Sequence, residues 1–193
     1  MTQPQRTAAV PGDDEKRSLG WAHTARFLTT ASRLDQLPAG ELPEIAFVGR
    51  SNAGKSTAIN ALTQQRRLAF ASKTPGRTQH INLFEVGPRE APDALFADLP
   101  GYGYAAVARG AKERWQEVMA EYLAVRRSLA GVVLLTKADK LNRREAQTAL
   151  RTAQDALGAY ATDAADIGVT LFSALGRQGI GDAAVNLHQW VHP

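Results

Sequence analysis

The chain has 193 residues, of which 44% are hydrophobic and 22% charged, a balance typical of one globular domain with a core of ordinary size. No apolar run approaches the roughly 20 residues that a membrane-spanning helix needs, and the absence of cysteine excludes disulfides, thiolate zinc sites and cysteine nucleophiles. The net charge of +4 is compatible with an RNA partner but is weak support on its own.

The first 20 residues mix Gln, Pro, Gly and charged side chains without periodicity, which predicts a disordered tail ahead of a single domain over 21–193. Because this stretch also lacks the apolar centre of a signal peptide, we expect a cytoplasmic protein. Residues 26–30 are rich in β-formers and predict the first strand.

Residues 49–56 read GRSNAGKS and match GxxxxGK[ST], the pattern of a phosphate-binding loop. A strand is predicted before the loop at 44–48 and a helix after it from Lys55 to about Thr63, which is the context that the pattern requires. Backbone N–H groups of the loop and the helix N-terminus would bind phosphate oxygens. Lys55 would reach the β- and γ-phosphates, and the Ser56 hydroxyl would bind Mg²⁺.

Two further strands are predicted over 81–86 and 94–97, joined as a hairpin. Directly after them, residues 98–101 read DLPG, which matches DxxG. In a GTPase the aspartate, here Asp98, holds Mg²⁺ through water, and the Gly101 N–H faces the γ-phosphate. DxxG is common by chance, and its place after a strand makes it credible here.

The remaining elements alternate between helix and strand. They are a helix over 111–128, a strand over 131–135, a helix opened by a capping box of Asn142 and Glu145, a strand over 169–172 and a helix from Asp182. This alternation predicts an α/β fold with helices on both faces of a mostly parallel sheet.

Residues 136–139 read TKAD, a variant of the guanine-reading pattern NKxD. Asp139 would accept hydrogen bonds from guanine N1–H and N2–H₂, which adenine cannot supply, so it would select guanine. Lys137 would lay its stem along the nucleotide, with a plain surface lysine as the alternative. The Ser-Ala pair at 173–174 could offer a backbone N–H to guanine O6.

The loop over 72–79 carries two threonines, either of which could close on Mg²⁺ when the γ-phosphate is present. Thr78 is favoured over Thr74. Tyr102 stands directly after DxxG, where many GTPases place a water-orienting glutamine, so we expect slow hydrolysis. Asn52 occupies the place where cation-assisted GTPases hold an asparagine that binds K⁺, and a purely loop-stabilising Asn52 is an equally open interpretation.

These segments together resemble the EngB family of bacterial GTPases, from about Phe27 to the C-terminus. The family-like strings are GRSNAGKST at 49–57, SKTPGRTQ at 72–79, INLF at 81–84, DLPGYGY at 98–104 and LTKADK at 135–140. The resemblance implies a three-layer P-loop NTPase fold of the Ras-like GTPase type. It also implies a monomer without membrane association that binds GTP or GDP with Mg²⁺ and hydrolyses GTP as a switch in large ribosomal subunit assembly. The large subunit or its rRNA would be the partner, and normal cell division and septation would need the protein.

The resemblance assigns the nucleotide to five segments of this chain. Their residues are Gly49, Arg50, Ser51, Asn52, Ala53, Gly54, Lys55 and Ser56; Gly76, Arg77, Thr78, Gln79 and His80; Asp98, Leu99, Pro100 and Gly101; Thr136, Lys137, Ala138 and Asp139; and Phe172, Ser173 and Ala174. Among them, Ser56, Thr78 and Asp98 would hold Mg²⁺. The catalytic set would be Lys55, Thr78, Gly101 and Asn52.

The interval over 102–135 is short for this fold, because a Ras-like GTPase places two helices and two strands there. Here it holds one helix and one strand, so one strand–helix unit, on the order of 30 residues, is missing. The short interval has three possible origins: a natural deletion, an artefact of the sequence, or a segment left out of it. The guanine loop would then shift inward by roughly 4.8 Å, one strand spacing, or the sheet would have a gap.

Two further interpretations concern RNA. The pairs at 66–67, 126–127 and 143–144 are each Arg-Arg and could contact phosphates, or they could be solvated helix faces. The alternative to a GTPase is a non-hydrolysing or defective RNA-assembly module that keeps the phosphate loop but no longer reads guanine.

Overall fold

The chain folds around one five-stranded sheet in a computed structural model that describes residues 12–49, 52–70, 80–101, 121–122, 124, 126, 128–134, 137–158 and 169–193. The strands are β1 (Arg26–Ala31), β2 (Glu44–Val48), β3 (Ile81–Val86), β4 (Ala94–Asp98) and β5 (Leu129–Leu134). The helices are α1 (Asp13–His23), α2 (Lys55–Leu62), α4 (Arg143–Gly158) and α5 (Ile180–Val191), with 3₁₀ turns η1 (Leu34–Gln36) and η2 (Ala138–Lys140).

The sheet has the order β1-β3-β4-β2-β5. The strand β2 runs parallel to both β4 and β5, whereas the β3–β4 hairpin and the β1–β3 pair are antiparallel. Every residue of β2 and β4 is buried, as expected for strands covered on both faces. The α/β fold is therefore confirmed, with the difference that the described sheet is mixed rather than mostly parallel.

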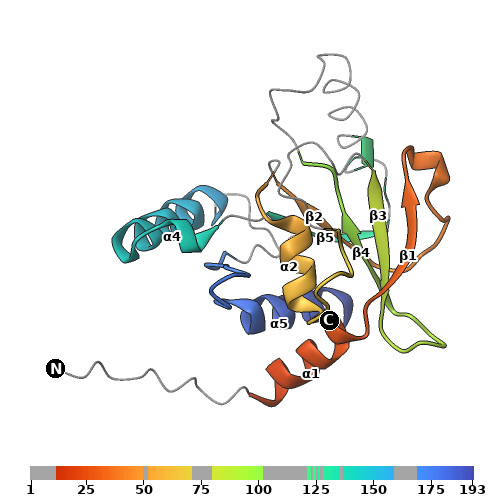
Figure 1. The fold of residues 1–193 in the computed structure, drawn as a ribbon, viewed down its shortest axis with the longest axis horizontal. Coiled ribbons are helices and arrows are strands. Elements are labelled where there is room, and N and C mark those ends of the chain that lie inside the picture. The colour runs from red at the N-terminus through yellow and green to blue at the C-terminus, as the bar shows by residue number, and fades with distance from the viewer. Residues whose placement is uncertain are drawn as a thin grey trace.

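Helices α1, α2 and α5 cover one face of this sheet (Figure 1). The core beneath them includes Trp21, Phe47, Ile59 and Phe96, all buried. On the opposite face a second buried cluster contains Tyr122, which is fully buried. Within the described residues, no helix is long and apolar enough to cross a membrane.

A buried carboxylate fixes the start of the phosphate-loop strand. Glu44 is fully buried, and its side chain accepts hydrogen bonds from Tyr122 Oη at 2.6 Å, Arg126 Nε at 2.7 Å and Ser128 Oγ at 2.8 Å. Burial, together with the charge of Glu44, raises the pKa of Tyr122. Arg126 is therefore committed to an internal ion pair, and the prediction that it contacts RNA phosphates is not supported.

Helix α1 begins inside the segment predicted to be a disordered tail, so that prediction is wrong for residues 13–20. Three acidic residues in its first turn favour the positive end of the helix dipole. Ser18, Trp21 and Ala22 form a buried stripe that packs against α5, and Trp21 Nε1 donates a 2.8 Å hydrogen bond to Asp93. Burial of this stripe, rather than local propensity, explains the helix.

The missing strand–helix unit has a visible consequence, because β5 pairs directly with β2. Of the two outcomes expected from the sequence, the sheet therefore adopts the inward shift and has no gap at this position. Helix α5 covers the join closely. A Cβ built on Gly131 of β5 would lie 2.2 Å from the Trp190 ring, so only glycine fits there.

Helix α4 is opened by the predicted capping box, in which the Asn142 and Glu145 side chains each accept a bond from the other's backbone N–H, at 3.0 and 2.8 Å. It lies apart from the sheet (Figure 1), and the residues of its apolar stripe from Ala146 to Ala153 are half-buried or exposed. The strand predicted over 169–172 is wrong, because this segment joins no ladder of the described sheet. Instead the Phe172 carbonyl accepts a 3.1 Å bond from the Ala138 N–H.

Candidate nucleotide-binding site

The phosphate loop runs from the end of β2 into α2, as predicted. Gly54, with φ of 100°, caps α2 in a left-handed conformation that favours glycine, and Asn52 is also left-handed at φ 63°. The first helical bond runs from the Ala58 N–H to the Gly54 carbonyl at 2.8 Å. The N-terminus of α2 therefore points its N–H groups toward the loop, where they can bind phosphate oxygens.

Lys55 folds back into this loop. Its ammonium donates a 3.2 Å hydrogen bond to the Gly49 carbonyl, and the residue is 7% exposed. Burial lowers the pKa of Lys55, and the nearby carboxylate of Asp98 opposes that shift. A desolvated cation at the mouth of the loop interacts more strongly with a phosphate than a lysine in open solvent would.

Ser56 and Asp98 form the second feature of the loop. The Ser56 hydroxyl donates a 2.6 Å hydrogen bond to Asp98 Oδ2, while Oδ1 is buried and meets no donor among the described residues. Burial raises the pKa of Asp98 to about 6, and the Ser56 bond and the Lys55 charge oppose that shift.

The chemistry of this pair fits Mg²⁺, which takes one or two protein oxygens and completes its shell with phosphates and water. A buried carboxylate oxygen without a donor, beside a hydroxyl, is the kind of group that a hard cation satisfies. The described residues contain no group of three His, Cys, Asp or Glu side chains placed to hold a metal. A site that relies on substrate phosphates needs no such group.

The loop predicted to read guanine lies on η2. Ser173 Oγ donates a 2.9 Å hydrogen bond to Asp139 Oδ1, and Lys140 lies 3.9 Å from Asp139 Oδ2. The Asp139 side chain is 21% exposed. The Ser173 backbone is fixed in turn by two 3.0 Å bonds with Gln178. Asp139 and Ser173, each expected to lie near guanine, are therefore in direct contact with each other.

The two halves of the site meet at Lys137. Its Cε lies 3.8 Å from the position that a Cβ on Gly54 would occupy, so the lysine stem lies against the phosphate loop. Lys137 is also exposed, so its role beside the nucleotide and its role as a surface lysine both stay predictions. The inward shift of β5 has thus not separated the guanine loop from the phosphate loop.

The remaining predicted residues are placed as follows. Leu99 and Pro100 are buried, Gly101 is half-buried after them, and Ala53 and Ala174 are half-buried in their loops. The segments that lie outside the described residues hold Arg50, Ser51, Thr74, Gly76, Arg77, Thr78, Gln79, Tyr102 and Thr136.

One contact at this edge was not predicted. His80, at the entry to β3, forms a 2.9 Å hydrogen bond with the Ser32 hydroxyl. The two residues are 48 positions apart, and no local pattern in the sequence links them.

Comparison with known proteins gives a consistent result. The family described as "50S ribosome-binding GTPase" matches residues 44–163. A probable GTP-binding protein EngB from Acidovorax ebreus is 52% identical over 207 aligned residues, covering 91% of this chain and 92% of that protein. A probable GTP-binding protein EngB from a Polaromonas species is 50% identical over 223 aligned residues, covering 99% of this chain and 88% of that protein.

Solved structures are more distant. The crystal structure of a probable GTP-binding protein engB aligns with a TM-score of 0.37 and 22% identity, over 60% of this chain and 55% of that chain. The structure of NFeoB from S. thermophilus bound to GDP·AlF₄⁻ and K⁺ aligns with a TM-score of 0.47 and 22% identity, over 78% and 62%.

The alignment lengths bear on the short interval before the guanine loop. The Polaromonas alignment spans 223 positions, whereas this chain has 193 residues. The relative therefore carries residues without a counterpart here, on the order of 30, which is the size of one strand–helix unit.

Proposed function

This chain belongs to the EngB family of GTP-binding proteins, and we propose that it is a Mg²⁺-dependent GTPase switch in assembly of the large ribosomal subunit. The observation that carries the proposal is the Ser56–Asp98 pair beside Lys55, at the end of β2 and the start of α2. The three side chains supply a hydroxyl, a carboxylate and a cation at one loop, which is what a nucleoside triphosphate with its metal requires.

On the phosphate side, the loop N–H groups and Lys55 would hold the β- and γ-phosphates. Bound Mg²⁺ would neutralise charge that develops on these phosphates, and Ser56, Asp98 and Thr78 would hold it. The Gly101 N–H would face the γ-phosphate and donate a hydrogen bond to it. This bond would form with GTP and be absent with GDP.

For hydrolysis, we propose a slow intrinsic rate. Tyr102 has no amide with which to orient the attacking water as a glutamine would. Asn52 is the candidate for a K⁺ ligand, because its side chain is exposed on the loop and could place a cation near the developing phosphate charge.

On the base side, Asp139 would select guanine. Its Oδ1 accepts from Ser173, which orients the carboxylate and leaves acceptor capacity for N1–H and N2–H₂. Lys137 against the phosphate loop supports one continuous nucleotide site. A defective module that cannot read guanine is less well supported, because these groups stay together.

The biological part of the proposal rests on the family. The matching family is described as ribosome-binding, which supports the large subunit or its rRNA as partner. We further propose a monomeric cytoplasmic protein without membrane association that is needed for normal cell division and septation.

Titration of the purified chain with fluorescent GDP, GTP and ATP analogues, with and without Mg²⁺, tests the proposal. Mg²⁺-dependent binding that prefers guanine nucleotides over ATP, together with slow phosphate release, is the expected result. Equal affinity for ATP and GTP would contradict the guanine assignment. Guanine binding without any phosphate release would favour the non-hydrolysing module.

A further inference from the structure

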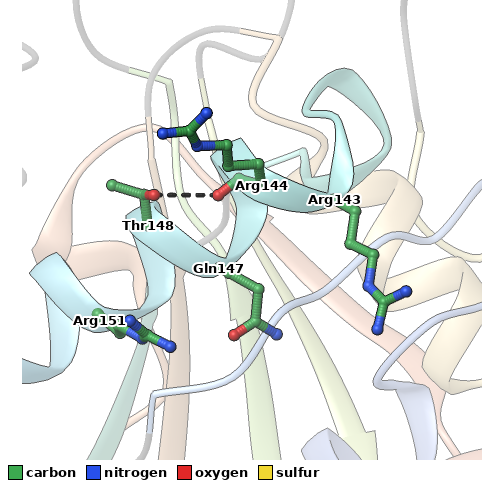
Figure 2. A pocket seen from close by; sticks show the side chains of 5 residues that line it. All are labelled: Arg143, Arg144, Gln147, Thr148 and Arg151. Carbon is green, nitrogen blue, oxygen red and sulfur yellow. Dashed lines mark hydrogen bonds between the residues drawn. The ribbon is translucent and has the colours of Figure 1, made fainter.

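We propose that one basic face of α4 is a docking surface for the phosphate backbone of double-helical RNA. Five side chains form the face and line an open hollow of ≈ 490 Å³ (Figure 2). They are Arg143, Arg144, Gln147, Thr148 and Arg151. The choice of RNA rests on the proposed ribosomal role, whereas the surface itself is independent of the nucleotide site.

Helical spacing explains why these side chains gather. Arg144, Gln147, Thr148 and Arg151 are at i, i+3, i+4 and i+7, so they share one face, and Arg143 flanks it. In Figure 2 the Gln147 amide lies between the side chains of Arg143 and Arg151. Arg144 and Arg151 are about 10 Å apart along the helix axis, at 1.5 Å per residue.

The charge on this face is not neutralised. Among the described residues, no carboxylate lies within ion-pair distance of Arg143, Arg144 or Arg151, whereas Arg17, Arg26, Arg33 and Arg126 all have acidic partners. Glu145 is occupied by the capping box, and Asp155, four residues after Arg151, forms no ion pair with it in the described part of the chain. The three guanidinium groups therefore keep their donors for an external anion.

The face is also accessible. All five side chains are exposed, and α4 lies apart from the sheet (Figure 1). An arginine presents a planar set of donors that binds phosphate in a bidentate manner, and Gln and Thr side chains bind phosphate and sugar oxygens. Within the face, Thr148 Oγ1 donates a 3.0 Å hydrogen bond to the Arg144 carbonyl.

The absence of aromatic side chains from these five residues decides between forms of RNA. Unpaired bases are held chiefly by stacking on aromatic rings, which this face does not offer. Duplex RNA presents phosphates and 2′-hydroxyls across a wide minor groove and needs only cationic and polar groups. An acidic protein surface is the competing occupant and becomes an outcome of the test.

The experiment uses the full chain and a labelled RNA duplex of about 16 bp, with fluorescence anisotropy as readout. Three phosphate contacts predict that affinity falls roughly 20- to 40-fold between 50 and 200 mM salt. The triple variant R143Q/R144Q/R151Q should lose at least about tenfold in affinity and most of this salt dependence. The triple Lys variant should retain part of the affinity, because it keeps the charge but not the bidentate geometry.

The matched control is R17Q/R33Q/R89Q, which removes the same charge from exposed arginines elsewhere. It should bind RNA like the unaltered chain. Equal weakening by both triples would reduce the effect to net charge and overturn the proposal. So would equal binding of duplex DNA, preference for single-stranded RNA, or no RNA binding at 50 mM salt, as expected if an acidic protein were the occupant.

Nucleotide titration of the same variants separates the two proposals. The α4 triple variant should bind GDP with unchanged affinity, because α4 does not pack against β2 or α2, the elements that flank the phosphate loop, in the described part of the chain. Loss of RNA binding with intact GDP binding supports the docking surface. A chain that binds RNA through α4 but binds no guanine nucleotide would instead overturn the proposed function alone.

Discussion

Ser56 donates a hydrogen bond of 2.6 Å to Asp98 across the junction of two sequence motifs that are 42 residues apart. The bond satisfies Oδ2, while the buried Oδ1 meets no donor in the described part of the chain. Burial raises the pKa of this carboxyl to about 6, against the opposing effects of the Ser56 bond and the Lys55 charge. Metal binding and protonation compete for the same oxygens, so the affinity for Mg²⁺ should depend on pH.

We predict that the affinity for Mg²⁺ is highest and constant well above pH 6, where Asp98 is ionised. Below pH 6 the affinity should fall about tenfold for each pH unit, because the metal requires the carboxylate. The free energy of unfolding of the metal-free protein should show the opposite trend. A folded pKa of about 6, against 3.8 unfolded, means that this group's stabilising contribution is complete below 3.8 and is lost as pH rises through 6. Denaturant melts with and without Mg²⁺ across this range provide the measurement.

Asp98→Asn is the control for this prediction. The metal-free variant should be more stable than the unaltered chain above pH 6 by about 3 kcal/mol, and it should gain nothing from Mg²⁺. Burial lowers the pKa of His23 and His188 below 6.5, so their contribution to stability is complete above 6.5 and lost as pH falls. Both chains share that trend, so their difference isolates Asp98. An unchanged difference between pH 4 and 8 would contradict the role of Asp98.

Lys55→Ala should abolish nucleotide binding. The ammonium would contact two phosphates, and charge-assisted bonds contribute about 1.5–3 kcal/mol each, so affinity should fall on the order of 100-fold or more. Fluorescent GDP and GTP titrations measure it. Lys16→Ala, an exposed lysine of α1, is the control and should bind normally. A loss smaller than about fivefold would exclude Lys55 as a phosphate ligand.

Asp139→Asn should relax the preference for guanine toward xanthine. The amide can donate to the xanthine C2 oxygen, whereas the carboxylate accepts from guanine N2–H₂. Ser173→Ala is the matched control, because it removes only the bond that orients Asp139. That variant should lose about 1 kcal/mol of guanine affinity without gaining xanthine. If Asp139→Asn kept its selectivity for guanine over xanthine in competition titrations, Asp139 would not be the guanine reader.

Local patterns predicted β2, α2 and the β3–β4 hairpin, because each has its own periodicity or motif within a few residues. Helix α1 could not be predicted in this way. Its stripe of Ser18, Trp21 and Ala22 is buried because it packs against α5, which lies at the far end of the sequence. Two separate motifs placed Asp139 and Ser173 near the same base, but neither motif predicts the hydrogen bond between them.

The failures at 169–172 and in α4 have one physical cause. Periodicity can show that a segment suits a strand or an amphipathic helix, but a ladder or a buried stripe also needs a neighbour. The sheet ends at β5, so 169–172 remains unpaired in the described sheet and the α4 stripe is at best half-buried. The basic face of α4 that includes Arg151 was not predicted. Only adjacent Arg-Arg pairs were considered, and Arg151 joins Arg144 on one face only through helical spacing.

Turnover in KCl should exceed turnover in NaCl if Asn52 binds K⁺. The exposed Asn52 has φ of 63°, which asparagine and glycine tolerate better than other residues do. Asn52→Gly therefore removes the amide while keeping the loop, and Asn52→Ala adds backbone strain. Loss of potassium stimulation in both variants supports the ligand. Stimulation retained in Asn52→Gly but lost in Asn52→Ala would assign Asn52 to loop stability alone.

The last prediction is that this chain binds guanine weakly and is only marginally stable. A domain has a net stability of about 5–15 kcal/mol, and a missing strand with its helix removes burial worth more than that margin. Restoring a strand–helix unit between Leu129 and Thr136 should return β5 to a position away from β2, bury the α4 stripe and raise both the melting temperature and GTP affinity.

A Gly/Ser linker of equal length at the same position is the control, and it should lower the melting temperature because it adds loop entropy without burial. Calorimetry and GDP titration compare the three chains. If the unaltered chain melts cooperatively above about 60 °C and binds GTP at micromolar affinity, the direct pairing of β2 with β5 is a stable solution. The contact of Lys137 with the phosphate loop would then suffice to place Asp139 at the base.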